Sequence, residues 1–250
     1  MDLTITTLAE RPGLLDALWR MPHLWPPFMM HDPVSDLAYP WMVRELPEYV
    51  QVATDADGTV VARSFSVPFR LAAEGRGRLP GRGWDQVLLW AWEDRQEGRE
   101  PDTVSAIEIT LARGVLGRGL SSVMLAAMRD NARRLGFDEV VAPVRPNGKH
   151  LEPGTPMDEY AFRTRESDGL PHDPWLRVHV RAGAVIEGVA PASMAIAHDL
   201  DRWREWTGLP FDTDGPVEVA GALAPVRCDT TAGYAVYVEP NVWVRHRIGA

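Results

Sequence analysis

Residues 104–147 read VSAIEITLARGVLGRGLSSVMLAAMRDNARRLGFDEVVAPVRPN. The first part, Val104 to Leu111, is apolar and rich in β-branched side chains, which predicts a β-strand. Three glycines and no proline follow between Arg113 and Gly119. From Leu120 onward apolar residues recur at helical spacing, and a further apolar segment after the helix predicts a second strand. The stretch therefore predicts a strand, a glycine-rich turn, an amphipathic helix and another strand.

The glycine-rich turn leads directly into the predicted helix. The first backbone N–H groups of a helix lack intrahelical partners, and the helix dipole adds partial positive charge at the same end. The N–H groups of Gly117 to Ser122 are therefore expected to form a cradle for an anion such as a phosphate.

Two common phosphate-binding motifs fit this turn poorly. A nucleotide-hydrolysing P-loop requires Lys and then Ser or Thr after its last glycine, but Leu120 follows Gly119. A dinucleotide-binding turn requires three glycines as G-x-G-x-x-G, and Ser122 replaces the third. The turn therefore favours neither nucleotide hydrolysis nor dinucleotide binding.

The segment 116–121, LGRGLS, resembles the (Q/R)-x-x-G-x-(G/A) motif of the GNAT superfamily of N-acyltransferases, which binds the pyrophosphate of acyl-coenzyme A. The order of elements over about residues 50–200 is similar as well. Residues 173–184, DPWLRVHVRAGA, resemble the later family helix, with Asp173 as N-cap and Gly183 as its stop. The resemblance implies acetyl-CoA or another acyl-CoA as cosubstrate and a small amine as acceptor.

Three positions depart from the family pattern. Leu116 stands where Gln or Arg is usual, which removes one side-chain donor but leaves the backbone N–H groups. Ser121 replaces the last small residue of the motif. His179 occupies the position of the family tyrosine that protonates the leaving thiolate.

The resemblance implies a set of contacts to acyl-CoA, with the backbone at the end of the strand orienting the thioester. These residues are Leu111, Ala112, Arg113, Leu116, Gly117, Arg118, Gly119, Leu120, Ser121, Ser122 and Asn147. Asn147 matches a family asparagine that contacts pantetheine, but His172 better fits its usual distance from His179. A turn-forming role for Asn147 is equally compatible with the sequence.

Transfer of an acyl group to an amine requires a group that accepts a proton and one that protonates the thiolate. Glu108 is the candidate base, and the pleat points it away from Ile107 and Ile109. The alternative is a structural carboxylate paired with an arginine. His179 is the candidate acid, since histidine titrates near neutral pH, although a buried core histidine is the alternative. Tyr160 is the second candidate acid.

The segment 21–42 contains five prolines, which interrupt helices, so short helices and turns are expected there. Its aromatic and methionine side chains either roof the acceptor site, as the first helices do in the family, or form a satellite core. They are Trp25, Phe28, Met29, Met30, Tyr39 and Trp41. Glu239 is a further carboxylate that can face the site. His23, His31 and Asp32 lack the spacing of metal ligands on one element, so no metal site is expected.

The remaining chain adds strands and helices around this unit. Asp55-Ala56-Asp57-Gly58 predicts a hairpin turn between two strands. Expected elements further along are a helix at 84–97, strands at 185–197 and 234–245, and a helix at 201–208. The whole predicts an α/β fold with a GNAT-like mixed central sheet of about six to seven strands flanked by helices.

We expect one domain over residues 1–250. The predicted insertions lie at about 70–103 and 148–172, and a C-terminal elaboration spans about 198–250.

Composition narrows the function further. The formal charge of −9 argues against a nucleic-acid partner. No segment approaches the ~18 consecutive apolar residues of a membrane span, and the N-terminus does not resemble a signal peptide. The single cysteine, Cys228, suits a reducing cytoplasm.

The sequence favours a cytoplasmic acyl-CoA-dependent N-acyltransferase, with acetyl as the expected acyl group and direct transfer in a ternary complex. A homodimer is compatible with it. Two alternatives stay open: a non-catalytic acyl-CoA-binding or partner-binding module, suggested by Leu116 and the missing tyrosine, and a CoA-thioester decarboxylase on the same fold.

Overall fold

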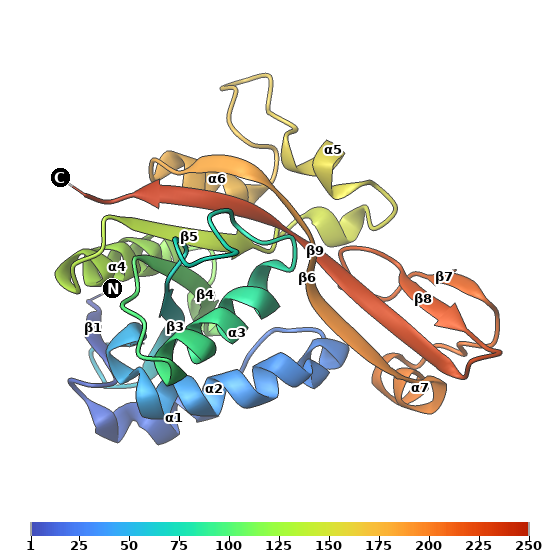
Figure 1. Ribbon diagram of the computed structural model, residues 1–250, viewed down its shortest axis with the longest axis horizontal. Coiled ribbons are helices and arrows are strands. Elements are labelled where there is room, and N and C mark those ends of the chain that lie inside the picture. The colour runs from blue at the N-terminus through green and yellow to red at the C-terminus, as the bar shows by residue number, and fades with distance from the viewer. Residues whose placement is uncertain (1, 250) are drawn as a thin grey trace.

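The computed structural model describes residues 2–249. Within them, nine strands form one sheet in the order β1-β2-β3-β4-β5-β9-β8-β7, with β6 paired to β9 outside this path (Figure 1). The strands are β1 (Thr4–Thr7), β2 (Val50–Thr54), β3 (Val60–Phe69), β4 (Thr103–Leu111), β5 (Glu139–Val144), β6 (Val185–Asp199), β7 (Gly215–Val217), β8 (Val226–Asp229) and β9 (Tyr234–Arg247). The mixed α/β architecture predicted from the sequence is confirmed, with more strands than the expected six to seven.

Helices cover both faces of the sheet. The α-helices are α1 (Leu15–Arg20), α2 (Pro33–Glu45), α3 (Gly83–Gln96), α4 (Leu120–Arg134), α5 (Met157–Ala161), α6 (Pro174–Arg181) and α7 (Leu200–Thr207). Short 3₁₀ helices are η1 (Pro12–Leu14), η2 (Pro27–His31), η3 (Pro47–Tyr49), η4 (Arg113–Val115) and η5 (Lys149–Leu151). None of the helices in the described part of the chain is long and apolar enough to cross a bilayer.

Side chains on the two faces of β9 show which helices lie on the same face of the sheet. Trp243 points to the face of α1, α2 and α3, where its indole N–H donates to the carbonyl of Pro80 at 2.9 Å. His246, three residues on, points to the opposite face, where its ring lies 2.9 Å from His179 of α6. Arg129 of α4 lowers the pKa of both histidines by its charge, so α4 lies on that same face. The two sides of the sheet therefore carry different helices.

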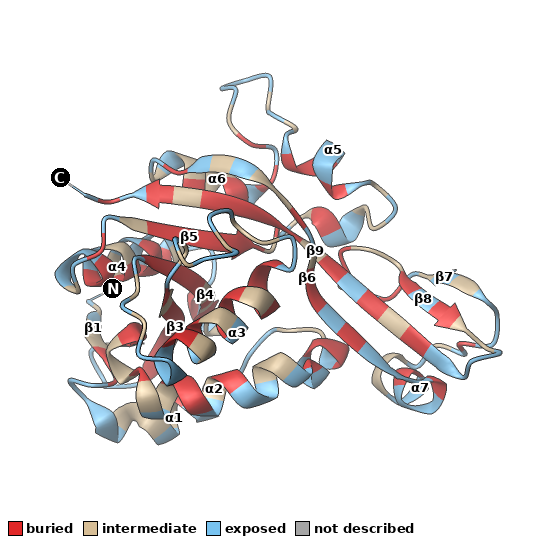
Figure 2. Cartoon of the chain, in the orientation of Figure 1, coloured by how far each residue is buried: buried red, intermediate tan, exposed pale blue. Residues whose placement is uncertain are grey.

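Buried residues concentrate on β2 to β5 and on β9, as Figure 2 shows. The predicted hairpin is confirmed, because β2 and β3 pair antiparallel across Asp55–Gly58. The helix at 84–97 is confirmed as α3, with Trp84, Val87, Leu88 and Ala91 buried. This packing places α3 between β3 and β4 in the chain and against β3 and β6 in space.

Strands β4 and β5 run parallel but stay together over a short distance. In the described chain they pair only at Val104↔Val140 and Ser105↔Val141. A bulge follows in β4, because Phe65 of β3 pairs with Glu108 and the next residue, Ser66, pairs with Ala106. The two strands then continue to Leu111 and Val144 without pairing. We call this divergence of the two backbones beyond Ser105 and Val141 the β4–β5 fork.

The longest strands extend the sheet into an arm. The second half of β9 pairs with β5, whereas its first half pairs with β8. Strand β6 follows β9 along both parts. The arm therefore comprises residues 195–238, with α7, β7 and β8 at its end (Figure 1). The short strands β7 and β8 are the part of the sheet that sequence analysis did not predict.

The proline-rich segment is more helical than predicted. Helix α2 has 13 residues, and its N-cap Asp32 accepts a hydrogen bond from the N–H of Ser35 at 2.7 Å. Pro33 occupies the first turn of α2. A backbone N–H at that position would have no partner within the helix, so proline costs no hydrogen bond there. Pro40 lies inside the helix but on its exposed side. The expectation of only short helices was wrong here, since one interior proline on a solvent-facing side removes a single backbone hydrogen bond.

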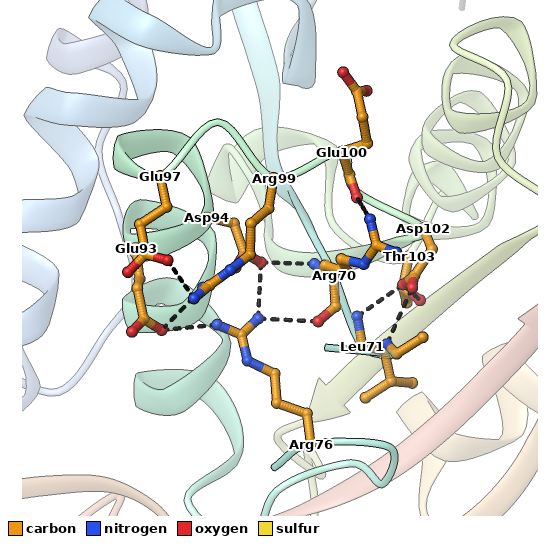
Figure 3. A network of polar contacts seen from close by, with 11 residues as sticks. Arg70, Leu71, Arg76, Glu93, Asp94, Glu97, Arg99, Glu100, Asp102 and Thr103 are labelled. Atoms are coloured by element: carbon orange, nitrogen blue, oxygen red, sulfur yellow. Dashed lines mark hydrogen bonds and ion pairs between the residues drawn. The ribbon is translucent and has the colours of Figure 1, made fainter. Parts of the chain in front are cut away.

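An ion-pair network fixes the loop before α3 (Figure 3). The guanidinium of Arg76 bonds to Glu93 at 2.7 Å and to Asp94 at 2.8 Å. Asp94 also accepts from the N–H of Arg70 at 2.7 Å and from Arg99 at 2.9 Å. Burial acts to raise the pKa of Asp94, but these hydrogen bonds outweigh burial and lower the pKa. The network ties residues 70–82 to the body of α3.

Candidate active site

The predicted anion cradle lies at the N-terminus of α4. Gly117 and Gly119 adopt φ values of +74° and +75°, which are left-handed conformations that favour glycine. Gly119 is the N-cap residue, and no described side chain caps this helix or places an acid in its first turn. By contrast, α2, α6 and α7 are capped by the carboxylates of Asp32, Asp173 and Asp199. The first N–H groups of α4 are therefore available to an anion.

The other predicted acyl-CoA contacts are contiguous with this cradle. Leu111 ends β4, and the N–H of Ala112 donates to the carbonyl of Val61 at 2.8 Å. Arg113 begins η4, and the side chain of Leu116 is about half exposed. Asn147 lies apart from them, as an exposed residue in the segment that follows β5. The predicted residues thus lie after the two strands that bound the β4–β5 fork.

Glu108 lies beside the bulge of β4 and is buried. One oxygen accepts from Arg63 Nε at 2.8 Å, and the other accepts from the hydroxyl of Tyr39. Burial and the neighbouring Glu108 carboxylate raise the pKa of Tyr39 well above its usual value. The indole of Trp84 donates to the carbonyl of Ile107 at 3.0 Å, next to this group. The arginine pairing considered in the sequence analysis is present, and the role of Glu108 as base stays a prediction.

His179 lies on α6 in the interior of the protein. Its Nδ1 is 2.9 Å from Nε2 of His246, which is paired with Val140 where β4 and β5 are still joined. Burial, with the nearby His246 and Arg129, lowers the pKa of His179 to about 3. The ring is therefore neutral at physiological pH and screened from water. This geometry gives no support to His179 as an acid for the thiolate.

Tyr160 lies nearer to the open end of the fork. Its hydroxyl donates to Asp173 at 3.0 Å, and Asp173 also accepts from the N–H of Gly148 at 2.7 Å. The hydroxyl lies against Gly148, where a Cβ atom would meet it at 2.5 Å. Gly148 follows the end of β5, and burial together with Asp173 raises the pKa of Tyr160. The second candidate acid thus lies at the same end of β5 as Asn147.

Glu239 lies on β9 with a side chain pointing to the face of α2 and α3. It is buried and accepts hydrogen bonds from Arg145 at 3.0 Å, Tyr237 at 2.7 Å and Asn241 at 3.0 Å. Arg145 follows the end of β5, so this ion pair joins β5 to β9 beside the fork. Glu239 is therefore a paired carboxylate on the same face as Glu108.

The aromatic and methionine side chains of residues 21–42 were expected either to cover the acceptor site or to form a satellite core, and the structure divides them. Phe28 packs on Tyr237 with ring centroids 5.1 Å apart, and Trp41 is buried, so both belong to the core. Tyr39 instead bonds to Glu108. Met30 is 44% exposed and contributes to neither role.

Two buried aspartates on this face were not identified as site residues from the sequence. Asp32 was considered only as a metal ligand, and Asp85, in the first turn of α3, was not considered. An acidic residue in the first turn of a helix usually reads as a favourable partner of the dipole. The signal for burial was the position of Asp85 beside Trp84 and Val87 on the apolar side of α3.

No family model matches the chain. The chain is similar in sequence to the arginine N-acetyltransferase avaD of Aspergillus versicolor, with 32% identity over 276 aligned positions that cover 98% of this chain and 94% of the relative. Two solved structures share the fold at 18% identity. One is the loading GNATL domain of CurA from Lyngbya majuscula, with a TM-score of 0.61, covering 99% of this chain and 97% of that chain. The other is the GphF GNAT-like decarboxylase in complex with isobutyryl-CoA, with a TM-score of 0.59, covering 99% of this chain and 100% of that chain.

Proposed function

The chain belongs to the GNAT superfamily and is an acyl-CoA-dependent N-acetyltransferase, and we propose that it acetylates the α-amine of arginine or of a similar small guanidino compound. The proposed reaction is direct transfer from acetyl-CoA within a ternary complex. The acceptor is inferred from the activity in the name of the fungal relative, which matches nearly the whole chain. The enzymatic activity in the name of this relative argues against the alternative of a non-catalytic module.

One observation carries the proposal: the uncapped N-terminus of α4 directly follows the strand that diverges from β5. Backbone N–H groups of residues 117–122 would hold the diphosphate of acetyl-CoA. The pantetheine arm would then pass along Leu111 to Arg113 into the β4–β5 fork, with Asn147 on its far side. There, unpaired backbone donors of β4 would stabilise the oxyanion that forms on the thioester carbonyl.

Glu108 is proposed to receive the proton of the attacking amine. Its bond to the hydroxyl of Tyr39 provides a route: the amine proton passes to the Tyr39 oxygen while the Tyr39 proton passes to Glu108. Arg63 Nε bonds to the other oxygen of the same carboxylate at 2.8 Å, which would hold Glu108 in position to accept the proton. For the departing thiolate, we propose Tyr160 as the proton donor in place of His179. The Tyr160 hydroxyl lies against Gly148, just past the end of β5, whereas His179 lies where β4 and β5 are still paired.

Direct transfer is favoured by the position of the single cysteine. Cys228 is buried in β8 within the arm, and burial raises the pKa of its thiol. A buried, protonated thiol outside the fork cannot serve as the nucleophile of a covalent acetyl-enzyme.

The experiment is a steady-state assay of CoA release from acetyl-CoA, with L-arginine varied and mass spectrometry of the product. We expect intersecting double-reciprocal lines, a product heavier by one acetyl group, and full activity of Cys228→Ser. Parallel lines or loss of activity in Cys228→Ser would contradict direct transfer. No acetylated product from arginine or from any other small guanidino amine would contradict the proposed acceptor.

A further inference from the structure

Two buried aspartates lie on the helices that cover the β4–β5 fork. Asp32 caps α2 and is fully buried, and Asp85 lies in the first turn of α3 with 2% exposure. Helix α2 contacts β4 at Glu108, and α3 contacts it at the carbonyl of Ile107. Both aspartates therefore belong to the face opposite α4, which is the side from which an acceptor would meet a thioester placed in the fork.

Neither carboxylate has a partner of opposite charge. Within residues 2–249, the Oδ1 atoms of Asp32 and Asp85 accept no hydrogen bond, and neither side chain forms an ion pair. Arg82 lies near enough to lower the pKa of Asp85 by its charge, but its guanidinium bonds to Gln86. The two carboxylates are therefore uncompensated in a region with little water.

The two buried glutamates on this face differ, because each forms an ion pair with an arginine. Glu108 pairs with Arg63 at 2.8 Å, and Glu239 pairs with Arg145 at 3.0 Å. An unpaired buried carboxylate is costly for a folded protein, so proteins rarely retain two of them without a function. The contrast between paired glutamates and unpaired aspartates marks the aspartates as a place for a cation.

The electrostatics agree with this assignment. Burial, reinforced by the charge of Asp32, raises the pKa of Asp85 to about 8. Burial likewise raises the pKa of Asp32 to about 6, and the charges of Asp36 and Glu239 act in the same direction. The backbone N–H groups of Ala195 and Ser35 oppose these shifts only in part. A cation bound between the two side chains would remove the repulsion and favour both ionised forms.

We propose that Asp32 and Asp85 bind the guanidinium group of the acceptor. This inference rests on the proposed function, in which a small amine is acetylated. The attacking amine must be neutral, so the positive charge that the aspartates bind belongs to a second group of the same molecule. A planar guanidinium carries five N–H donors in a fork that can serve two carboxylates at once. Because both aspartates are screened from water, the side chains over them must separate as the acceptor enters.

A metal ion fits this place less well. In the part of the chain that the structure describes, no three His, Cys, Asp or Glu side chains converge as metal ligands do. A guanidinium needs only the two carboxylates, because it binds them through N–H groups rather than through a closed set of ligands.

Close packing fixes the position of Asp85. A Cβ atom on Gly83 would come within 2.2 Å of Ser193 Oγ, so only glycine lets α3 approach β6 this closely. The N–H of Trp84 then donates to the same oxygen at 2.8 Å. The Arg76 network binds Glu93 and Asp94 near the other end of the same helix (Figure 3), so α3 is held at both ends.

The test compares L-arginine with L-citrulline, a neutral isostere of its guanidinium, in the wild type, Asp85→Asn and Asp32→Asn. Asparagine still caps helices, and Asp36→Asn, an exposed change on α2, is the matched control. Each site variant should raise KM for arginine by about 10- to 100-fold, the usual effect of losing a charged hydrogen bond, and leave KM for citrulline nearly unchanged. Titration calorimetry with L-arginine alone should show the same loss of affinity. Both site variants should unfold at the same temperature as the wild type or higher, whereas Asp36→Asn should keep the wild-type KM for both arginine and citrulline.

Wild-type affinity for arginine in both site variants would overturn the subsite, and so would equal affinity of the wild type for arginine and citrulline. Acetyl transfer to an amine with an unchanged preference in the variants would overturn the subsite and leave the proposed function standing. Arginine binding that the variants weaken, without any acetyl transfer by the wild type, would support the subsite and overturn the proposed function.

Discussion

At the scale of single residues, the carboxylates that are buried between the sheet and helices α2 and α3 have two kinds of surroundings. Glu108 and Glu239 are each joined to an arginine, whereas Asp32 and Asp85 are not. A carboxylate paired with an arginine can hold the local geometry, whereas a buried carboxyl group without such a partner is stabilised when a cation binds to it. A carboxyl group can therefore serve two purposes in the proposed reaction: acceptance of a proton and binding of the acceptor.

Glu108→Gln tests the proposed base. Removing the carboxylate should lower kcat by about 10²- to 10⁴-fold, the usual contribution of a general base. It should also destabilise the fold by about 3 kcal/mol, because the buried guanidinium of Arg63 loses its counter-charge. The measurements are kcat over a range of pH and urea unfolding. Tyr39→Phe is the companion variant, since it keeps the ion pair and removes only the bridging hydroxyl. Unchanged turnover in both variants would exclude the proposed route for the proton.

Tyr160→Phe and His179→Asn separate the two candidate acids. We expect Tyr160→Phe to lower kcat by about 10²-fold through loss of the proton donor. His179→Asn should keep kcat and lower only thermal stability, because it disturbs a buried contact with His246. The measurements are kcat with saturating acetyl-CoA and the midpoint of thermal unfolding. The reverse pattern would return the role of acid to His179.

At the scale of elements, the turn from β4 to α4 determines where acetyl-CoA can bind. Helix α2, on the opposite face of the sheet, has a capping aspartate at its N-terminus, whereas the N-cap residue of α4 is Gly119. A carboxylate at the N-terminus of α4 would stabilise the helix and at the same time repel a diphosphate. Stability and binding should therefore change in opposite directions there.

Ser122→Asp tests this opposition, with Ser122→Asn as the neutral control of similar shape. The aspartate variant should bind acetyl-CoA about 10- to 100-fold more weakly, as expected for a like charge placed beside the diphosphate. Its melting temperature should equal or exceed that of the wild type, by the helix-dipole effect. Calorimetric titration with acetyl-CoA and thermal unfolding measure the two effects. Equal affinity of the two variants would show that the diphosphate binds elsewhere.

Sequence patterns predicted the elements with strong local signals. The hairpin at Asp55–Gly58, the turn before α4 and the capped helix α6 all depend on residues close together in the chain. Strands β7 and β8 were missed because they have only 3 and 4 residues and depend on tertiary pairing, β8 with β9 and β7 with β8. Helix α2 was underestimated, because whether Pro40 faces solvent or core depends on tertiary packing.

The candidate site was predictable in the same uneven way. The cradle follows from neighbouring residues, so the sequence was sufficient to place it. Tyr39 is far from Glu108 in the chain, and the packing of α2 on the sheet brings them together. Asp85 is likewise far from Glu239 in the chain, and the packing of α3 brings it close enough to feel the charge of that residue. No periodicity in one sequence reports such contacts between distant elements.

At the scale of the whole molecule, the unpaired aspartates should make stability depend on pH. The folded pKa of Asp85 is about 8, well above the ordinary value near 3.8, because of burial and the charges of Asp32 and Glu239, which Arg82 opposes only in part. Between about pH 4 and pH 8 the folded protein therefore binds a proton that the unfolded chain has lost. Stability falls as pH rises through this window.

Urea unfolding from pH 5 to pH 9 measures this dependence. The free energy of unfolding should fall by on the order of 3 kcal/mol between pH 5 and pH 8, at about 1.4 kcal/mol per pH unit where the proton difference is complete. Asp85→Asn should remove most of the slope above pH 6 and be more stable than the wild type at pH 8. Saturating L-arginine should flatten the wild-type slope, because it supplies the missing charge. A slope that Asp85→Asn leaves unchanged would show that other groups titrate.

The position of β9 has a consequence for the synthesis of this protein. The strand is the last in the chain order, yet it lies inside the sheet and joins β5, β6 and β8. While the ribosome is still translating the preceding residues, both the core and the arm lack their common strand and expose open hydrogen-bonding edges. Completion of the sheet must wait until residue 247 has left the ribosome, and until then the open edges of β5, β6 and β8 are places where nascent chains can pair with one another.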